Sequence, residues 1–224
     1  MDYRTYLDRM LRAARTLLRT FSGSREYWQN RYANGDNSGH GSVGELATFK
    51  AEVLNDLVIR RDLRSVIEFG CGDGRQLKLF SFPQYVGFDV STYALDLCRE
   101  AFSDDNTKRF RNLDEYRDDK ADLALSLDVI QHLVEDTVFT EHMRKLFGSA
   151  RQCVAIYSGN FDDRRRLRGP HVCFREFTRW IEQHETNWKL LHHIPNPYPR
   201  SRKAHGSFSE FFIYVPIDSA GGVP

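Results

Sequence analysis

Residues 65–74 read Ser-Val-Ile-Glu-Phe-Gly-Cys-Gly-Asp-Gly. The apolar run over 66–69 predicts a buried parallel strand. Gly70, Gly72 and Gly74 follow it directly, and glycine lets a backbone turn tightly and approach a ligand where any Cβ would collide. A strand that ends in such a loop predicts a ligand site at the carboxyl edge of a parallel sheet.

A second strand-like run, Tyr-Val-Gly-Phe over 85–88, ends in Asp89, which lies 19 residues after Gly70. A carboxylate at that offset is placed to accept hydrogen bonds from the two hydroxyls of a ribose. The loop and Asp89 together predict a nucleoside-containing cofactor, whereas the loop alone could be an ordinary glycine-rich turn.

The glycine spacing argues against a dinucleotide. That fingerprint requires Gly-x-Gly-x-x-Gly, but Arg75 holds the sixth position and the third glycine comes one place early, at Gly74. Glu68, inside the first strand, would also put negative charge beside a pyrophosphate. We therefore expect no binding of NAD.

These features resemble the motifs of one enzyme family. The loop over 70–74, preceded by Glu68, looks like motif I of the class I S-adenosylmethionine-dependent methyltransferases, and Asp89 looks like motif II. Residues 122–128, Asp-Leu-Ala-Leu-Ser-Leu-Asp, resemble the fourth-strand motif. The resemblance covers most of the chain from Tyr27 onward.

Four further stretches, 28–32, 37–42, 49–55 and 127–133, resemble a bacterial subgroup often associated with glycan or other secondary biosynthesis. The resemblance implies S-adenosyl-L-methionine as the cofactor. The residues expected to hold it are Trp28, Arg31, Ser38, Glu68, Gly70, Cys71, Gly72, Asp89, Val90, Asp114 and Leu127.

Residues 27–42 are expected to form a lid over the cofactor; the alternative is an extension that only packs. In the lid interpretation, Arg31 or Lys50 pairs with the carboxylate of the cofactor. Trp28 and Tyr32 cover its sulfonium by cation–π contact.

Strands are predicted near 66–69, 85–89, 108–112, 123–127, 154–157, 188–194 and 207–215, and helices near 45–60, 92–101, 137–146 and 174–183. The alternation predicts an α/β fold with a doubly wound parallel sheet. The long loop before the last strand, and the family resemblance, predict seven strands with the last one antiparallel. We assign residues 1–60 to a helical amino-terminal extension with the lid, and residues 61–224 to the methyltransferase core.

The composition describes a globular protein without an obvious charged partner. The chain has 224 residues, 41% hydrophobic and 28% charged, and a net charge of +1, so nothing electrostatic demands a nucleic acid or a membrane. No apolar run is long enough for a membrane span, and the amino terminus lacks the apolar stretch of a signal peptide. Four cysteines without metal-ligand spacing indicate reduced thiols and a cytoplasmic setting.

Apolar residues recur at helical spacing over 3–21, with arginines on the other faces. Such a basic amphipathic helix can lie on an anionic membrane. Packing on its own domain or in a homodimer interface is the preferred interpretation.

Methyl transfer to an alcohol requires a general base. His132 follows the fourth strand, close to where the methyl group should point, and His171 could face it across the pocket. With Asp128 they form the predicted catalytic set. These three could also hold magnesium, but no compact ligand spacing supports a metal site, and none is assigned.

The favoured function is O-methylation of a small hydroxylated acceptor, such as a sugar. N- or carboxyl-methylation of another small metabolite, and a non-catalytic cofactor-binding protein, remain open. Residues 196–199, Asn-Pro-Tyr-Pro, resemble a motif of amino-group methyltransferases, but they lie in a late loop instead of after the fourth strand.

Overall fold

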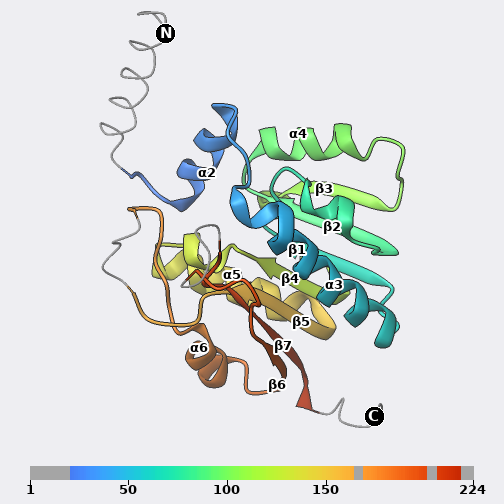
Figure 1. Cartoon of the computed structure of the whole chain (residues 1–224), viewed down its shortest axis with the longest axis vertical. Coiled ribbons are helices and arrows are strands. Elements are labelled where there is room, and N and C mark those ends of the chain that lie inside the picture. The colour runs from blue at the N-terminus through green and yellow to red at the C-terminus, as the bar shows by residue number, and fades with distance from the viewer. Residues whose placement is uncertain (1–20, 164–168, 201–205, 218–224) are drawn as a thin grey trace, which may run out of the picture.

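The computed structural model describes residues 21–163, 169–200 and 206–217. Within these ranges seven strands form one sheet in the order β3-β2-β1-β4-β5-β7-β6 (Figure 1). The strands are β1 Ser65–Phe69, β2 Gln84–Asp89, β3 Lys108–Asn112, β4 Ala121–Leu127, β5 Ala150–Ser158, β6 Trp188–Ile194 and β7 Glu210–Pro216. β1 to β5 pair in parallel, and β7 lies antiparallel between β5 and β6. The predicted doubly wound sheet with an antiparallel last strand is confirmed.

Helices cover both faces of the sheet. They are α2 Ser24–Ala33, α3 Gly44–Arg60, α4 Thr92–Ala101, α5 Asp136–Ser149 and α6 Phe177–His184, with short 3₁₀ turns η1 His40–Ser42, η2 Gln76–Leu79, η3 Leu113–Glu115 and η4 Ile130–His132. Buried side chains of α3 and α4 share one apolar cluster with the sheet, and those of α5 and α6 share the other. The molecule is therefore a three-layer α/β structure.

The central strands are apolar on both sides because both faces are covered. In β1, Val66 belongs to the cluster under α3 and α4, whereas Ile67 and Phe69 belong to the cluster under α5 and α6. Successive side chains of a strand point to opposite faces, which explains why apolar residues do not simply alternate with polar ones in this strand. Complete burial of each such side chain contributes roughly 1.5–3 kcal/mol.

The predicted starts of one helix and one strand are wrong, in both cases because the residues just before the element form isolated β-bridges with another loop. The helix predicted from residue 174 begins at Phe177, because Phe174 and Arg175 form bridges with Asp163 and Asn160. The strand predicted from residue 207 begins at Glu210, because Ser207 bridges to Pro199 in the preceding loop.

The amphipathic segment over 3–21 and the arginine-rich run over 164–168 lie, apart from Phe21, outside the described residues. No helix in the described ranges is long and apolar enough to cross a membrane. The division at residue 60 stays a prediction, although α3 places Leu54 and Leu57 in the apolar cluster beneath the sheet.

Helix α2 lies across the carboxyl edge of the sheet. Its side chains reach residues that follow three different strands: Gln29 contacts Val90 after β2, Arg25 contacts Asp114 after β3, and Ser24 contacts Glu135 after β4. The strand order reverses between β1 and β4, and a crevice forms at such a point in an open α/β sheet. Helix α2 therefore covers the place where a ligand is expected.

Candidate active site

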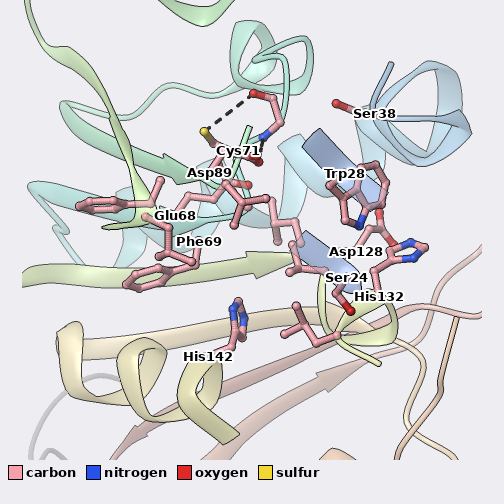
Figure 2. Close-up of a pocket in the computed structure, with 18 of the residues that line it drawn as sticks. Ser24, Trp28, Ser38, Glu68, Phe69, Cys71, Asp89, Asp128, His132 and His142 are labelled. Atoms are coloured by element: carbon pink, nitrogen blue, oxygen red, sulfur yellow. Dashed lines mark hydrogen bonds between the residues drawn. The ribbon is translucent and has the colours of Figure 1, made fainter. Parts of the chain in front are cut away.

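A cavity of about 230 Å³ opens at the carboxyl edge, between β1 and β4. Its wall is built by the loop after β1, the ends of β2 and β4, and the α2–η1 segment (Figure 2). Figure 2 shows Glu68, Cys71 and Asp89 grouped on one side and Asp128 and His132 on the other. The cavity thus joins the predicted cofactor loop to the predicted base.

The loop after β1 accepts only glycine at two positions. Gly70 and Gly72 have φ values of 89° and 58°, in the left-handed region. A Cβ on Gly70 would lie 2.4 Å from Cγ2 of Val129. A Cβ on Gly72 would lie 2.6 Å from Ser38 Oγ and 2.7 Å from Tyr32 Oη. The loop therefore forms a close backbone cradle against the lid.

Asp89 is held at the end of β2 by backbone donors. The Gly72 N–H donates to Oδ2 and the Ser91 N–H donates to Oδ1, each at 2.9 Å. The carboxylate is buried, and burial raises the pKa of Asp89 above its usual value. A carboxylate has about four lone-pair sites, so Asp89 can still accept a hydrogen bond from a ligand hydroxyl.

Glu68 lies deeper in the wall. It is 6% exposed, and Tyr85 Oη–H donates to its Oε2 at 2.6 Å. Burial raises the pKa of Glu68 to about 7, because charging a carboxylate away from water is costly. At neutral pH the Glu68 side chain is therefore largely shared between its protonated and charged forms.

The segment over 24–42 is fastened to the domain from both ends. The Ser24 N–H and Oγ–H donate to the Glu135 carboxylate at 2.9 and 2.5 Å. Ser38 Oγ–H donates to Asp73 Oδ1 at 2.8 Å and lies 2.9 Å from Tyr32 Oη. The predicted lid is therefore hydrogen-bonded directly to the glycine loop.

On the opposite side, the hydrogen bonding of His132 selects one ring tautomer. Its Nδ1 lies 3.1 Å from the carbonyl oxygen of His171, and a carbonyl can only accept, so Nδ1 carries the proton and Nε2 keeps its lone pair. The Trp28 ring meets the imidazole edge-on, with centroids 5.0 Å apart. Burial lowers the pKa of His132 to about 4, so the ring is neutral at pH 7.

Asp128 lies beside His132 and holds a buried ion pair. Lys50 Nζ is 2.7 Å from Asp128 Oδ2, and the lysine side chain is 1% exposed. Ser209 Oγ–H donates to Oδ1 at 2.8 Å. Asp128 adopts φ 58°, and Gly41 of the lid packs so closely that a Cβ there would lie 2.8 Å from Oδ2. The carboxylate is thus positioned from three separate parts of the chain.

Comparisons with known proteins agree with this geometry. Residues 67–156 match a family model described as a methyltransferase domain. A search of curated protein sequences found no match. Residues 67–156 therefore form a methyltransferase domain, and the fold around it is that of the class I S-adenosylmethionine-dependent methyltransferases.

Solved structures similar to this methyltransferase share its fold. N-methyltransferase NodS from Bradyrhizobium japonicum WM9, in complex with S-adenosyl-L-homocysteine, is 12% identical, with 88% of this chain and 100% of that chain covered and a TM-score of 0.67. Magnesium protoporphyrin IX methyltransferase from Synechocystis PCC 6803, with the same molecule bound, is 15% identical, with 90% and 99% covered and a TM-score of 0.60. The methyltransferase domain of bacterial CtHen1-C is 19% identical, with 75% and 97% covered and a TM-score of 0.60.

The cofactor of the methyltransferase is S-adenosyl-L-methionine, and the cavity fits it. Asp89 keeps lone-pair capacity for the ribose hydroxyls, and the loop that contains Gly70 and Gly72 lines the cavity. The Asp89 carboxylate and the aromatic ring of Trp28 suit a positively charged ligand.

Most residues predicted to hold the cofactor line the cavity: Trp28, Ser38, Glu68, Gly70, Cys71, Gly72, Asp89, Val90 and Leu127. Arg31 and Asp114 are not among the lining residues. Arg31 Nε donates to the Asn37 carbonyl at 2.9 Å, with its guanidinium 5.3 Å from the Trp28 ring. Asp114 forms an exposed ion pair with Arg25, which lowers the pKa of that carboxyl.

Two predictions about charged partners need correction. Lys50 was one of two residues, with Arg31, offered as a partner of the cofactor carboxylate, but it pairs with Asp128 and does not line the cavity. His171 does not face His132 across the pocket. Its ring stacks between Tyr27 and His132, with centroid distances of 4.3 and 5.7 Å, and its backbone carbonyl lies against Nδ1 of His132.

The three residues considered for magnesium, Asp128, His132 and His171, do not form a donor set. Asp128 is committed to Lys50 and Ser209, and the Nδ1 of His132 to a carbonyl. In the part of the chain that the structure describes, no group of three His, Cys, Asp or Glu side chains is arranged to hold a metal ion. No metal role is assigned to these residues.

Sequence reasoning missed two residues that shape the site, Asp73 and Arg175, and named a third, Lys50, with a different partner. Asp73, inside the glycine loop, holds the lid through Ser38, and its polar character in a tight buried loop was a usable signal. Lys50, on the apolar face of α3, signalled a buried ion pair whose partner was not readable. Arg175, which holds the loop around His132, gave no local signal.

Proposed function

We propose that this methyltransferase methylates a hydroxyl group of a small acceptor, such as a sugar or a glycan precursor, with His132 as the general base. One observation carries the proposal. Nδ1 of His132 is committed to the His171 carbonyl, so Nε2 offers its lone pair from a ring that lines the cofactor cavity.

An alcohol is a poor nucleophile until its proton leaves, and a positioned base contributes about 10²- to 10⁴-fold to such a step. When bound, S-adenosyl-L-methionine supplies a methyl group on a positively charged sulfur. His132 is neutral at pH 7 and can therefore take the proton at Nε2. The negative charge of Asp128 nearby favours the imidazolium that results. Trp28 packs on the ring and limits the access of water.

Methylation of an amine or a carboxylate is the competing hypothesis, because those acceptors need less help from a base. The place of His132 in the cavity wall supports a hydroxyl acceptor. NodS is an N-methyltransferase, but at 12% identity the likeness concerns the fold alone.

The protein is proposed to act in the cytoplasm. All four cysteines, Cys71, Cys98, Cys153 and Cys173, are free thiols, which supports a reducing, cytoplasmic setting.

The test is a transfer assay with methyl-labelled S-adenosyl-L-methionine and a panel of small acceptors. Sugars and nucleotide sugars are compared with matched amino sugars and sugar acids. We expect label on the hydroxyl compounds, in a product that resists mild alkali, as an ether does. Label only on amines, or product that releases methanol in alkali as a methyl ester does, would overturn the proposal.

A further inference from the structure

A short segment after β5, residues 171–175, runs beside the loop that carries His132. The Cys173 N–H donates to the Gln131 carbonyl at 2.8 Å. Two residues earlier, the His171 carbonyl accepts from Nδ1 of His132. Residues 171–175 and the His132 loop are therefore paired at a fixed offset, and this pairing places the His171 carbonyl opposite Nδ1 of His132.

Arg175, at the carboxyl end of the segment 171–175, joins it to the chain that follows His132. Its side chain is 5% exposed, and its guanidinium donates to the carbonyls of Leu133 and Val134 at 2.6 and 2.7 Å. It also donates to Asp136 Oδ1 from Nε and Nη2, at 3.1 and 2.8 Å. The guanidinium carbon lies 4.9 Å from the centre of the Phe139 ring.

Such a set of contacts needs a guanidinium. Its donors point in a rigid planar fork, so one group can bind two successive carbonyls and a carboxylate together. A lysine ammonium is a compact point charge on a flexible stem and cannot hold all three in a fixed geometry. A buried charge is costly unless it is paired, so Arg175 strongly favours the one arrangement that satisfies it.

We propose that Arg175 is a positioning residue for the base: it locks residues 171–175 against the His132 loop and thereby decides which ring nitrogen of His132 carries the proton. The inference rests on the proposed role of His132 as the general base. Without the lock, the His171 carbonyl moves away from Nδ1, and nothing in the contact selects one tautomer. A part of the molecules then presents an N–H, instead of a lone pair, at Nε2.

The experiment reads the tautomer directly. Protein labelled with ¹⁵N-histidine and saturated with S-adenosyl-L-homocysteine is observed by long-range ¹H–¹⁵N correlation at pH 7. The chain has 8 histidines, and loss of one signal set in His132→Asn assigns the base. We expect wild-type His132 to show a pyrrole-type Nδ1 and a pyridine-type Nε2.

Arg175→Lys keeps a positive charge beside Asp136 but loses the fork. Its His132 should show averaged ring shifts, and affinity for S-adenosyl-L-homocysteine should stay within about twofold. Arg175→Met should give the same or a larger shift if it folds. Arg179→Met is the matched control, because Arg179 is 61% exposed and contacts Glu176 on its own helix segment. It should leave the His132 signals unchanged.

The inference is overturned if His132 in Arg175→Lys keeps the wild-type ring shifts, or if Arg179→Met averages the ring shifts as much as Arg175→Lys does. The tautomer measurement itself does not depend on activity, so it can be read whether or not His132 is the base. If His132→Ala keeps full activity, the base assignment fails while the tautomer measurement still decides what Arg175 does. If Arg175→Lys averages the tautomers, its turnover should fall on an otherwise active enzyme, with the Michaelis constant for S-adenosyl-L-methionine nearly unchanged.

Discussion

The two sides of the cavity are built over different distances along the chain. On the cofactor side, Gly72 reaches Asp89 across 17 residues and Asp89 reaches Ser91 across 2. On the base side, His132 contacts His171 across 39 residues, and Asp128 contacts Lys50 and Ser209 across 78 and 81. One side is a local motif, whereas the other exists only after the sheet, α3 and the late loops have packed together.

The two sides also differ in charge. The buried acidic side chains of Glu68, Asp73 and Asp89 lie in or beside the cofactor loop. The base side holds a neutral histidine and a carboxylate that is paired with Lys50. The cofactor side is therefore rich in acidic groups, whereas the base side holds one proton in a defined place. Changes on the two sides should separate binding from turnover.

The largest effect is expected on the base side. His132→Ala should lower turnover by about 10²- to 10⁴-fold and leave affinity for S-adenosyl-L-methionine nearly intact. Calorimetric titration gives the affinity, and a labelled-methyl assay with the identified acceptor gives the rate. Loss of affinity together with rate would mean that His132 is a structural residue, and full activity would rule it out as the base.

The pH dependence sharpens the same assignment. Because burial lowers the pKa of His132 to about 4, the base loses its lone pair only below that pH. The turnover of the wild-type enzyme should rise with pH through about 4 and be level by pH 6. A rising limb near 6.5, the ordinary histidine value, would contradict the buried environment of His132.

The next largest effect is expected at the ribose site. Asp89→Ala removes two charge-assisted hydrogen bonds to the cofactor, each worth roughly 1.5–3 kcal/mol. Affinity for S-adenosyl-L-methionine should fall by about tenfold or more, measured by calorimetry. Asp96→Ala is the control, since Asp96 is 65% exposed and pairs with Arg99 on α4, away from the cavity. Unchanged affinity in Asp89→Ala, or tighter binding of NAD than of S-adenosyl-L-methionine, would contradict the cofactor geometry.

A smaller loss is expected where the lid meets the loop. Gly72→Ala forces a side chain into the left-handed region, at a cost of about 1–2 kcal/mol, and pushes on Ser38 and Tyr32. Affinity for the cofactor should fall by about 5- to 30-fold. In Gly148→Ala, on α5, the added Cβ has no atom within 4 Å, so that variant should bind normally. Equal affinities would show that the lid does not depend on this contact.

The last prediction concerns stability, not binding or turnover. The folded pKa of Glu68 is raised to about 7, above its ordinary 4.5, so its contribution is complete below pH 4.5 and is lost as the pH rises through 7. The free energy of unfolding of the wild type, relative to Glu68→Gln, should decrease by about 3 kcal/mol between pH 4 and pH 8. His132 and His142, which act in the opposite sense, are common to both proteins and cancel. A constant difference, measured by denaturant titration, would mean that Glu68 is not buried as a neutral acid.

Much of the cofactor side could be predicted because each of its features is local. The strand over 66–69, the glycine loop and Asp89 lie where the spacing placed them, within one residue at strand ends. The exceptions depend on packing. Asp114 was expected at the cofactor, but Arg25 from α2 holds it at the surface, and the sequence does not tell how a helix docks.

The base side shows the reverse. The position of His132 after β4 could be expected, but its tautomer depends on a backbone carbonyl 39 residues away. Lys50 was assigned to the wrong partner, because an inward-facing lysine shows only that some anion is near. The role of Arg175 left no trace in the local pattern, since its partners are main-chain carbonyls that every residue has.

The sequence by itself determined the doubly wound α/β architecture, the glycine loop and the acid at the end of the second strand, because hydrophobic periodicity and backbone freedom act over a few residues. Only the tertiary structure decided which charges pair, which ring nitrogen of His132 carries the proton and how residues 27–42 pack on the glycine loop. Those properties depend on distances between atoms that are far apart along the chain, and on burial, which changes the cost of a charge. If the same residues packed differently, the chain would keep its glycine-loop motif but lose the arrangement around His132 on which its proposed role depends.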